Sequence, residues 1–339
     1  MLLVTSLVSL ITMIGSLAAL TPSEAGTATT NLTTIWGSGS ERLRAINVSG
    51  AILSDASDGA LLAAGTFGNE VAKQIDELTS EDASGLLLLV NTPGGSIGGS
   101  RAISDAVERY QERTANRVLV HVTSMSASGG VYATASADEI ISDHGALIGS
   151  IGVIFGPFTQ YTDVVGTTGN ILESGVTTTG GITQEYLSQG TGKDFGNPYR
   201  PMTDEERANY TSGLKVEYDN FVEHVSQHRD IPSEKIVNDL GAFMFDPETA
   251  QNHGLIDGIM GRDEFFRHAA ESAGLDPDDT RVEAVRAPSA WESLLGAERP
   301  FGSAPAVDQG PGVVPALSRS FCGGTQPLAF AGDLAGVCG

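Results

Sequence analysis

The sequence predicts an α/β domain, and two patterns support that class. Short apolar runs that suit buried strands alternate with longer segments of helical periodicity. The run at 86–90 contains only Leu and Val, as expected of a parallel strand that helices cover on both faces. The chain has 339 residues, 40% of them hydrophobic, which is enough for one large core.

The first half of the domain alternates strands with helices. The helix after the 86–90 strand is the clearest, because its apolar residues recur at the i, i+3, i+4, i+7 spacing of a single face. A later strand ends in a loop of small residues, and a second helix opens there at Ser128. In order, we expect strands at 45–53, 86–90 and 118–122, and helices at 67–78 and 96–111.

The second half begins with short strands and ends with helices. Thr203 and Glu206 have the spacing of a capping box, which predicts a long helix from there to about His228. Asp263 is a candidate cap for the last helix. The other expected elements are strands at 139–142 and 152–155 and a helix at 247–252.

The chain ends differ in composition from the domain. Residues 1–20 are predicted to be a transmembrane anchor or a signal peptide, because the segment is apolar, uncharged and long enough to cross about 30 Å of hydrocarbon. The folded domain would then be membrane-anchored and extracytoplasmic, or secreted if the segment is cleaved. We expect a flexible tether at 21–42, the folded domain at 43–274 and a disordered tail at 275–339.

Two further features concern the surroundings of the protein. Acidic residues outnumber basic ones 42 to 19, and the net charge of −23 would repel phosphates, so we expect no nucleic-acid partner. Cys322 and Cys338, the only cysteines, lie in the tail, where a disulfide and two free thiols remain open alternatives.

Two glycine-containing loops at strand ends could carry chemistry. Ser128 stands between small residues in Ser-Ala-Ser-Gly-Gly at 126–130, so its hydroxyl would be accessible to a substrate and close to a helix start. A serine nucleophile also needs donors for the oxyanion, and the N–H groups of Gly95 and Gly129 are the candidates. An ordinary strand-to-helix turn is the structural alternative for the loop at 91–96.

The serine also needs a base. His144 is the nearest histidine downstream, but its Asp-His-Gly context is typical of a turn. Lys193 could serve if partial burial lowers its pKa, and a solvated surface lysine is the alternative. His224 and His228 lie one helical turn apart and could share a metal, but no third ligand accompanies them in the sequence. We therefore expect a solvated or salt-bridged pair and no metal site.

Four ordered blocks between residues 45 and 274 resemble the signal peptide peptidase A family. The resemblance implies that Ser128 is the nucleophile, that Lys193 is the general base and that Ser150 supports the lysine. It also implies a ClpP/crotonase-like fold with repeated β-β-α units, a homo-oligomeric ring, remnant signal peptides and unfolded segments as substrates, and no cofactor. The blocks are Asn-Thr-Pro-Gly-Gly at 91–95, Ser-Ala-Ser-Gly-Gly at 126–130, Ile-Gly-Ser-Ile-Gly-Val at 148–153, and Gly-Lys-Asp at 192–194 followed by Pro-Met-Thr at 201–203.

One departure from the family leaves alternatives open. The stretch between Ser150 and Lys193 is longer than expected, and the extra residues fall at about 176–190. The predicted function is a serine endopeptidase that acts at the membrane. An inactive ring-forming scaffold or partner-binding relative is the alternative outside enzymes, and an acyl-CoA enzyme of the crotonase fold is a rival that would not need Ser128 and Lys193 together.

Overall fold

The computed structural model describes most of the predicted domain. The described residues are 32–55, 65–158, 160, 187 and 189–285, together with the backbone of 328–330. The predicted anchor or signal peptide at 1–20 lies outside them, as do Cys322, Cys338 and nearly all of the expected insertion. Among the described residues, no helix is both long enough and apolar enough to span a membrane.

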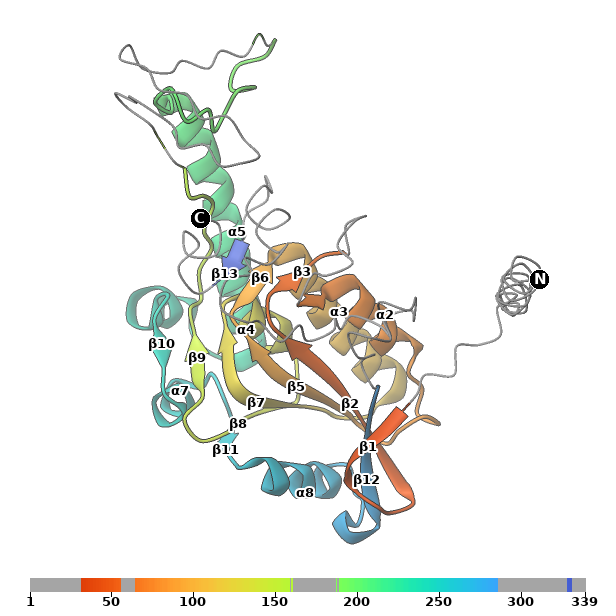
Figure 1. Ribbon diagram of the computed structural model, residues 1–339. Helices are drawn as coiled ribbons and strands as arrows, with labels where there is room; N and C mark the ends of the chain where they lie inside the picture. The colour runs from red at the N-terminus through yellow and green to blue at the C-terminus, as the bar shows by residue number, and fades with distance from the viewer. Residues whose placement is uncertain are drawn as a thin grey trace, which may run out of the picture. The chain divides into compact units, whose positions relative to one another are not determined.

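A nine-stranded sheet forms the centre of the domain (Figure 1). Its main path runs β1-β12-β2-β5-β7-β8-β11, and β9 pairs with β7 and β10. All pairs are parallel except β1 with β12 and β10 with β9. The strands are β1 (Leu32–Gly37), β2 (Glu41–Ser49), β5 (Leu86–Thr92), β7 (Val118–Ala127), β8 (Glu139–Ser142), β9 (Leu147–Gly149), β10 (Met244–Phe245), β11 (Gly258–Ile259) and β12 (Thr280–Val285).

A smaller sheet lies beside the first in the order β13-β6-β3-β4. Its strands are β3 (Ile52–Leu53), β4 (Thr66–Phe67), β6 (Gly94–Ser96) and β13 (Leu328–Phe330). A strand of the large sheet is followed by short strands of the small sheet and then by a helix. The order is β5, β6 and α3 (Ile97–Thr114) in one case, and β2, β3, β4 and α2 (Gly68–Glu77) in the other. This is the repeated β-β-α order that the sequence predicts.

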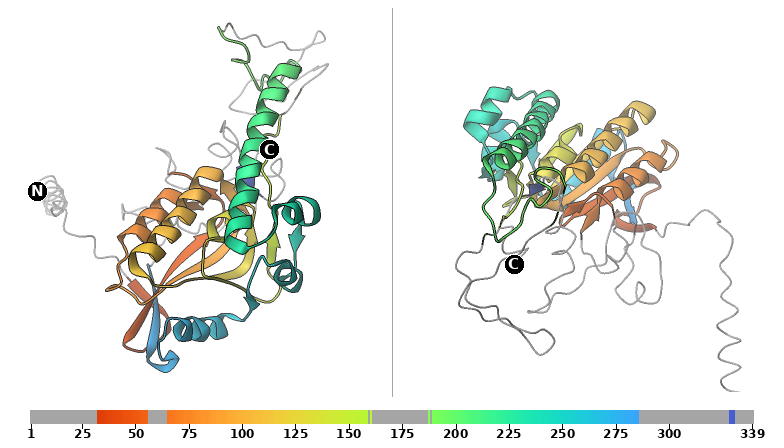
Figure 2. Two further views of the ribbon diagram at one scale, coloured as in Figure 1. Left: turned by 180° about the vertical axis from the view of Figure 1, so that it is seen from behind. Right: turned by 90° about the horizontal axis from the view of Figure 1, so that it is seen from above.

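Helices cover both faces of the large sheet, so the α/β class is confirmed (Figures 1 and 2). On one face, α2, α3 and α4 pack on apolar residues of β5 and β7 such as Leu88 and Val120. On the other face, Phe265 and Phe266 of α8 pack on Leu87. The remaining helices are α4 (Gly129–Thr134), α5 (Asp204–Arg229), α6 (Ser233–Lys235), η1 (Ile236–Leu240), α7 (Pro247–His253), α8 (Arg262–Ser272) and η2 (Pro277–Asp279).

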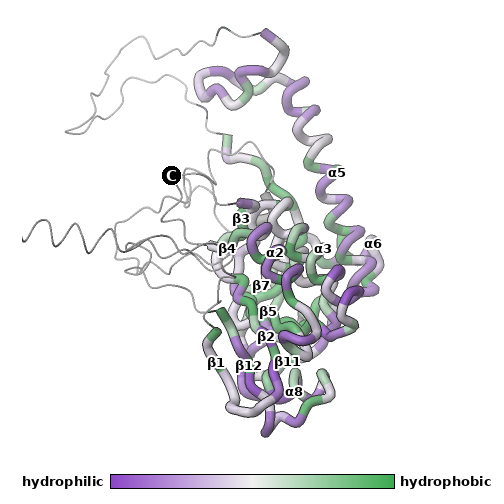
Figure 3. Tube along the Cα trace, turned by 90° about the vertical axis from the view of Figure 1, so that its right-hand side faces the viewer, coloured by the Kyte–Doolittle hydropathy of each residue, from purple (hydrophilic) through white to green (hydrophobic). Residues whose placement is uncertain are grey.

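Helix α5 differs from the others in hydropathy and position. Thr203 and Glu206 form the predicted capping box, with the Thr203 hydroxyl accepting from the Glu206 N–H at 3.1 Å. Apart from Glu206, only Phe221, Val222 and Val225 near the C-terminal end are buried. The rest of the helix is mostly hydrophilic and extends away from the sheet (Figures 1 and 3).

The folded region extends past the predicted bounds of 43–274 at both ends. Strand β1 falls in the predicted tether, and β12 falls in the predicted tail, where it lies between β1 and β2. Strand β13 also falls in that tail. Val282 and Ala284 are buried, but they alternate with charged residues in a short strand, so the sequence there has no long apolar run to mark it.

Two smaller expectations near the domain's second half were wrong. The strand expected at 152–155 is reduced to a bridge at Ile154, because the preceding residues 147–149 pair with β7 instead. Asp263 does not cap α8; the N-cap is Gly261, and Asp263 lies in the first turn, where its carboxylate accepts from the Trp36 indole at 2.7 Å.

Phe265→Ala should lower the free energy of unfolding by about 3–5 kcal/mol, because the ring is fully buried and stacks on His121 at 4.6 Å. Phe243→Ala is the matched control, since that ring is 71% exposed and its loss should change stability by less than about 0.5 kcal/mol. Urea unfolding measures both. Equal effects of the two substitutions would contradict the assignment of α8 to the core.

Candidate active site around Ser128

Ser128 is held in a constrained corner between β7 and α4. Its backbone has φ 52° and ψ −114°, a combination that non-glycine residues rarely adopt and that is often found at functional sites. The Ser128 N–H donates to the Gly149 carbonyl at 2.8 Å, and its own carbonyl accepts from the Tyr132 N–H at 3.1 Å. The corner is therefore fixed by β9 on one side and by the first turn of α4 on the other.

The side chain of Ser128 is also enclosed. The residue is 1% exposed, and its hydroxyl donates to the Gly152 carbonyl at 3.2 Å. A hydroxyl in this arrangement has its proton directed at a carbonyl that cannot remove it. Attack on a substrate would require a base to replace Gly152 as the acceptor.

Ser150 lies next to Ser128 through the register of the sheet. Met125, Ser126 and Ala127 of β7 pair in parallel with residues 147–149 of β9, so continuing the register brings residues 128 and 150 abreast. Both residues lie just past the paired strands, so the register places their backbones close together. Ser150 is itself buried, has φ 57°, and donates its N–H to the Phe243 carbonyl at 2.7 Å.

The two predicted oxyanion donors flank the same corner. Gly129 is the first residue of α4, and Gly95 is in β6, which α4 contacts. A Cβ on Gly130 would lie 2.6 Å from the Thr92 methyl group, so α4 packs directly against the end of β5. Ser128, Ser150, Gly95 and Gly129 thus belong to one region of the molecule, and the oxyanion role of the two glycines stays a prediction.

Lys193 is the predicted site residue that the structure does not bring to Ser128. Its side chain is exposed, in a turn-rich segment before α5, and no hydrogen bond or ion pair within the described ranges joins it to Ser128. The start of α5 at Asp204 lies about 25 Å along the helix from the buried Phe221. Figure 1 shows this segment at the end of α5 that is away from the sheet.

An ion cluster fixes the segment that carries Lys193. The Arg200 guanidinium donates to both oxygens of Asp194 and to both oxygens of Glu206, at 2.6–2.9 Å. It lowers the pKa of Asp194 and lowers the pKa of Glu206 from 4.5 to about 2. Charge-assisted pairs with this forked geometry are stronger than single ones, so the turn after Lys193 is tied to the first turn of α5.

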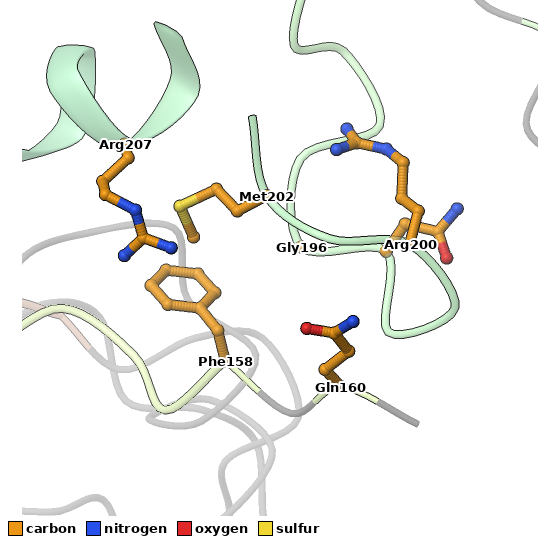
Figure 4. A pocket seen from close by; sticks show the side chains of 7 residues that line it. Phe158, Gln160, Gly196, Arg200, Met202 and Arg207 are labelled. Carbon is orange, nitrogen blue, oxygen red and sulfur yellow. The ribbon is translucent and has the colours of Figure 1, made fainter. Parts of the chain in front are cut away.

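A pocket of about 320 Å³ opens beside this cluster (Figure 4). Phe158 and Gln160 lie on one side of it, and Met202 and Arg207 come from the start of α5 and the turn before it. Aromatic rings of Phe155, Phe158, Phe195 and Tyr210 stack or pack edge to face nearby. The outer end of α5 thus carries a second ordered cluster of side chains. The sequence does not predict it, because residues 155–158 and 195–210 are far apart in the chain.

Comparisons with known proteins show which family the chain resembles. The model of "Peptidase family S49" matches residues 111–276, a range that includes Ser128, Ser150 and Lys193. Over this range, just under half of the chain, the protein is similar to peptidase family S49. The predicted resemblance to signal peptide peptidase A is confirmed, and so is the prediction of a serine peptidase at the level of the family.

Individual relatives are more distant. A protein of Methanocaldococcus jannaschii named as a candidate protease is 28% identical over 59% of this chain and 60% of its own length. An Enterococcus faecium protein named as a candidate signal peptide peptidase SppA is 24% identical over 66% and 61%. This chain therefore aligns with less than two thirds of either relative. A mutant of ClpP1 from Listeria monocytogenes has a TM-score of 0.40 and 15% identity over 65% of this chain and 93% of its own.

Two residues that shape the corner at Ser128 are not predicted by the sequence. The Thr92 hydroxyl donates to the Gly50 carbonyl at 2.6 Å and accepts from the Gly94 N–H at 3.0 Å, so it joins the two sheets beside Ser128. Gly152 supplies the carbonyl that holds the Ser128 hydroxyl. Gly152 belongs to the block at 148–153 that carries part of the family resemblance. A sequence motif does not indicate, however, in which direction a backbone carbonyl points.

Gly95→Ala should reduce peptide cleavage by about 100-fold, because a Cβ there would lie 1.9 Å from the Ile52 carbonyl oxygen and would push β6 out of position. Gly213→Ala is the control, since nothing lies within 4 Å of a Cβ on that helical residue. Steady-state cleavage and melting temperature measure the effect. A fully active Gly95→Ala protein would contradict a role for β6 in the site.

Arg200→Ala should expose the 189–203 segment to chymotrypsin at Phe195 and Tyr199, because it removes the cation shared by Asp194 and Glu206. Arg207→Ala, which leaves both ion pairs intact, is the control. The Glu206 carboxyl has a lowered pKa, so its contribution is complete above pH 4.5 and is lost as the pH falls through about 2. Equal cleavage of the two variants at pH 7 would rule out this role for Arg200.

Proposed function

We propose that this chain is a serine endopeptidase with a ClpP/crotonase-like fold and Ser128 as its nucleophile. The observation that carries the proposal is the constrained corner at Ser128, which places a buried hydroxyl beside Gly129 and close to β6. Attack of the Ser128 oxygen on a peptide carbonyl would form an acyl-enzyme and release the amine, and water would then release the acid. Backbone N–H groups of Gly95 and Gly129 would hold the oxyanion.

An extended peptide is the substrate that suits this site. Strand β6 pairs with β3 on one edge, and on the other edge Leu328–Phe330 adds antiparallel to Gly94–Ser96. Helix α4, which begins directly after Ser128, contacts both β6 and β13. A segment of the chain itself therefore occupies the edge on which a substrate would form backbone hydrogen bonds, a recurring mode of peptide recognition.

Lys193 would act as general base on the Ser128 of a second copy. Within one chain it stands near the outer end of α5, about 25 Å along that helix from the residues that reach the core. The Arg200 cluster holds its segment there. A dyad between copies brings the two groups together without breaking that cluster, and it requires the predicted homo-oligomeric ring.

Exposed apolar residues support contact between copies at this end of the chain. Ile154, Phe158 and Leu187 are large hydrophobic residues that are 44%, 43% and 95% exposed. Phe158 is one of the aromatic rings that pack near Lys193's segment, and Ile154 directly precedes Phe155, another of them. A neighbouring copy that covers them would gain hydrophobic burial while it receives Lys193.

We further propose that the chain acts at a membrane, anchored by residues 1–20, and that remnant signal peptides and other unfolded segments are its substrates. The apolar composition of 1–20 supports the anchor. The small residues around Ser128 leave room for apolar side chains. If residues 1–20 are cleaved instead, the protein would be secreted.

Two observations favour the alternative of an inactive scaffold. The Ser128 hydroxyl is engaged by the Gly152 carbonyl, and the lysine is remote within one chain. A family member that assembles but never brings Ser128 and Lys193 together would show both features. Reactivity of Ser128 separates this alternative from the peptidase.

A fluorophosphonate probe and casein cleavage test the proposed peptidase. We expect the unmutated chain to be labelled and to cleave casein, and Ser128→Ala to lose both, as general-base catalysis requires the hydroxyl. Ser126→Ala, two residues earlier in β7, is the matched control and should retain labelling. An unlabelled, inactive but oligomeric wild-type chain would favour the scaffold.

Phe158→Asp should separate the copies and abolish cleavage while the chain stays folded, because it places a charge in the proposed contact. Val237→Asp is the control, since that residue is 45% exposed and belongs to η1 at the opposite end of α5. Light scattering and casein cleavage are the measurements. A Phe158→Asp monomer with full activity would contradict the dyad between copies.

A further inference from the structure

The fold brings a carboxylate to the histidine pair on α5, for which the sequence indicates no third ligand. His224 and His228 stand one turn apart on α5, and their ring centroids are 4.5 Å apart. Helix α3 brings Glu108 to them, and its carboxylate oxygen lies 3.2 Å from His228 Nε2. One ligand atom from each of the three residues falls within 4.8 Å of the others. The sequence could not indicate Glu108, because it lies more than a hundred residues before His224.

The hydrogen bonds of His224 leave one ring nitrogen available for a metal. His224 Nε2 is 3.0 Å from the Tyr132 carbonyl oxygen, which can only accept, and 3.1 Å from the Ser104 hydroxyl oxygen, which can accept as well. Nε2 therefore carries the proton and Nδ1 has the lone pair. Metal-binding histidines characteristically donate their second ring N–H to a carbonyl or carboxylate in this way.

The spacing of the other two groups also suits a metal. Ligand atoms about 2.1 Å from a tetrahedral ion are about 3.4 Å apart, close to the 3.2 Å between His228 Nε2 and Glu108. The carboxylate supplies a negative charge that offsets part of the charge of a divalent ion. Arg101 is the opposing charge, because its guanidinium Nε donates at 3.1 Å to the hydroxyl of Tyr132, whose ring stacks on His224.

We propose that Glu108, His224 and His228 bind a divalent transition-metal ion such as Zn²⁺, away from the proposed peptidase site. Two imidazoles and one carboxylate are a ligand set that such ions accept, with water completing the coordination. The ion would join α3 to the buried end of α5. It would also act on α4, because the Tyr132 ring stacks on the His224 ring at 4.1 Å. The role would be structural, since the ion would join two helices and none of its three ligands is a predicted site residue.

Cobalt titration of the full chain, without a histidine tag and in high salt to screen the acidic surface, tests the site. We expect one Co²⁺ per chain with the visible absorption of a tetrahedral centre, and displacement by Zn²⁺. His228→Ala and Glu108→Gln should each weaken binding roughly 10- to 100-fold. His144→Ala, an exposed histidine in a turn, is the control and should bind as the unmutated chain does.

Thermal unfolding provides a second readout. Zn²⁺ at roughly 100-fold above its Kd should raise the melting temperature by about 5 °C in the unmutated chain and in His144→Ala, but not in His228→Ala or Glu108→Gln. The melting temperature without metal shows whether each variant is folded. The proposal is overturned if no tetrahedral Co²⁺ spectrum forms, or if both folded variants bind Co²⁺ as tightly as the unmutated chain.

Discussion

The parallel register of β7 is the constraint on which the candidate site depends. On one side β7 pairs with β5, and on the other its last residues pair with β9, so the chain must turn sharply at Ser128 to begin α4. The backbone strain at Ser128 is supported by the Gly149 carbonyl and by the packing of Gly130 on Thr92. If β9 shifted by one residue, Ser150 would no longer lie abreast of Ser128 and the hydroxyl would lose its fixed direction.

The same sheet explains why the molecule has two separate polar regions. Ser128 and Ser150 are buried where strands of the large sheet end, whereas Lys193 belongs to a segment that contacts the start of α5. Only the last turns of α5 pack on the core, so its first turns extend beyond the sheet (Figure 1). In the proposed mechanism, a serine inside the domain and a lysine at its outer end would form one site only when copies associate.

Much of this arrangement could be predicted from the sequence. The buried strands and the capping box at Thr203 have strong local signals, and Ser128, Ser150 and Gly95 follow from motifs at strand ends. Strand β12 could not be predicted, because its stability comes from pairing with β2 and not from its own composition. The distance of Lys193 from Ser128 and the contact of Glu108 with His228 depend on helix placement, which motif order does not encode.

Mixing of two inactive variants measures the central claim most directly. Ser128→Ala keeps Lys193, and Lys193→Ala keeps Ser128, so a site shared between copies is intact when the two variants are neighbours in the right order. Dissociation and reassembly of an equal mixture should restore about a quarter of the unmutated activity, as random placement in a closed ring gives. Recovery of casein cleavage at that level would support the shared dyad. A mixture that assembles but stays inactive would contradict it.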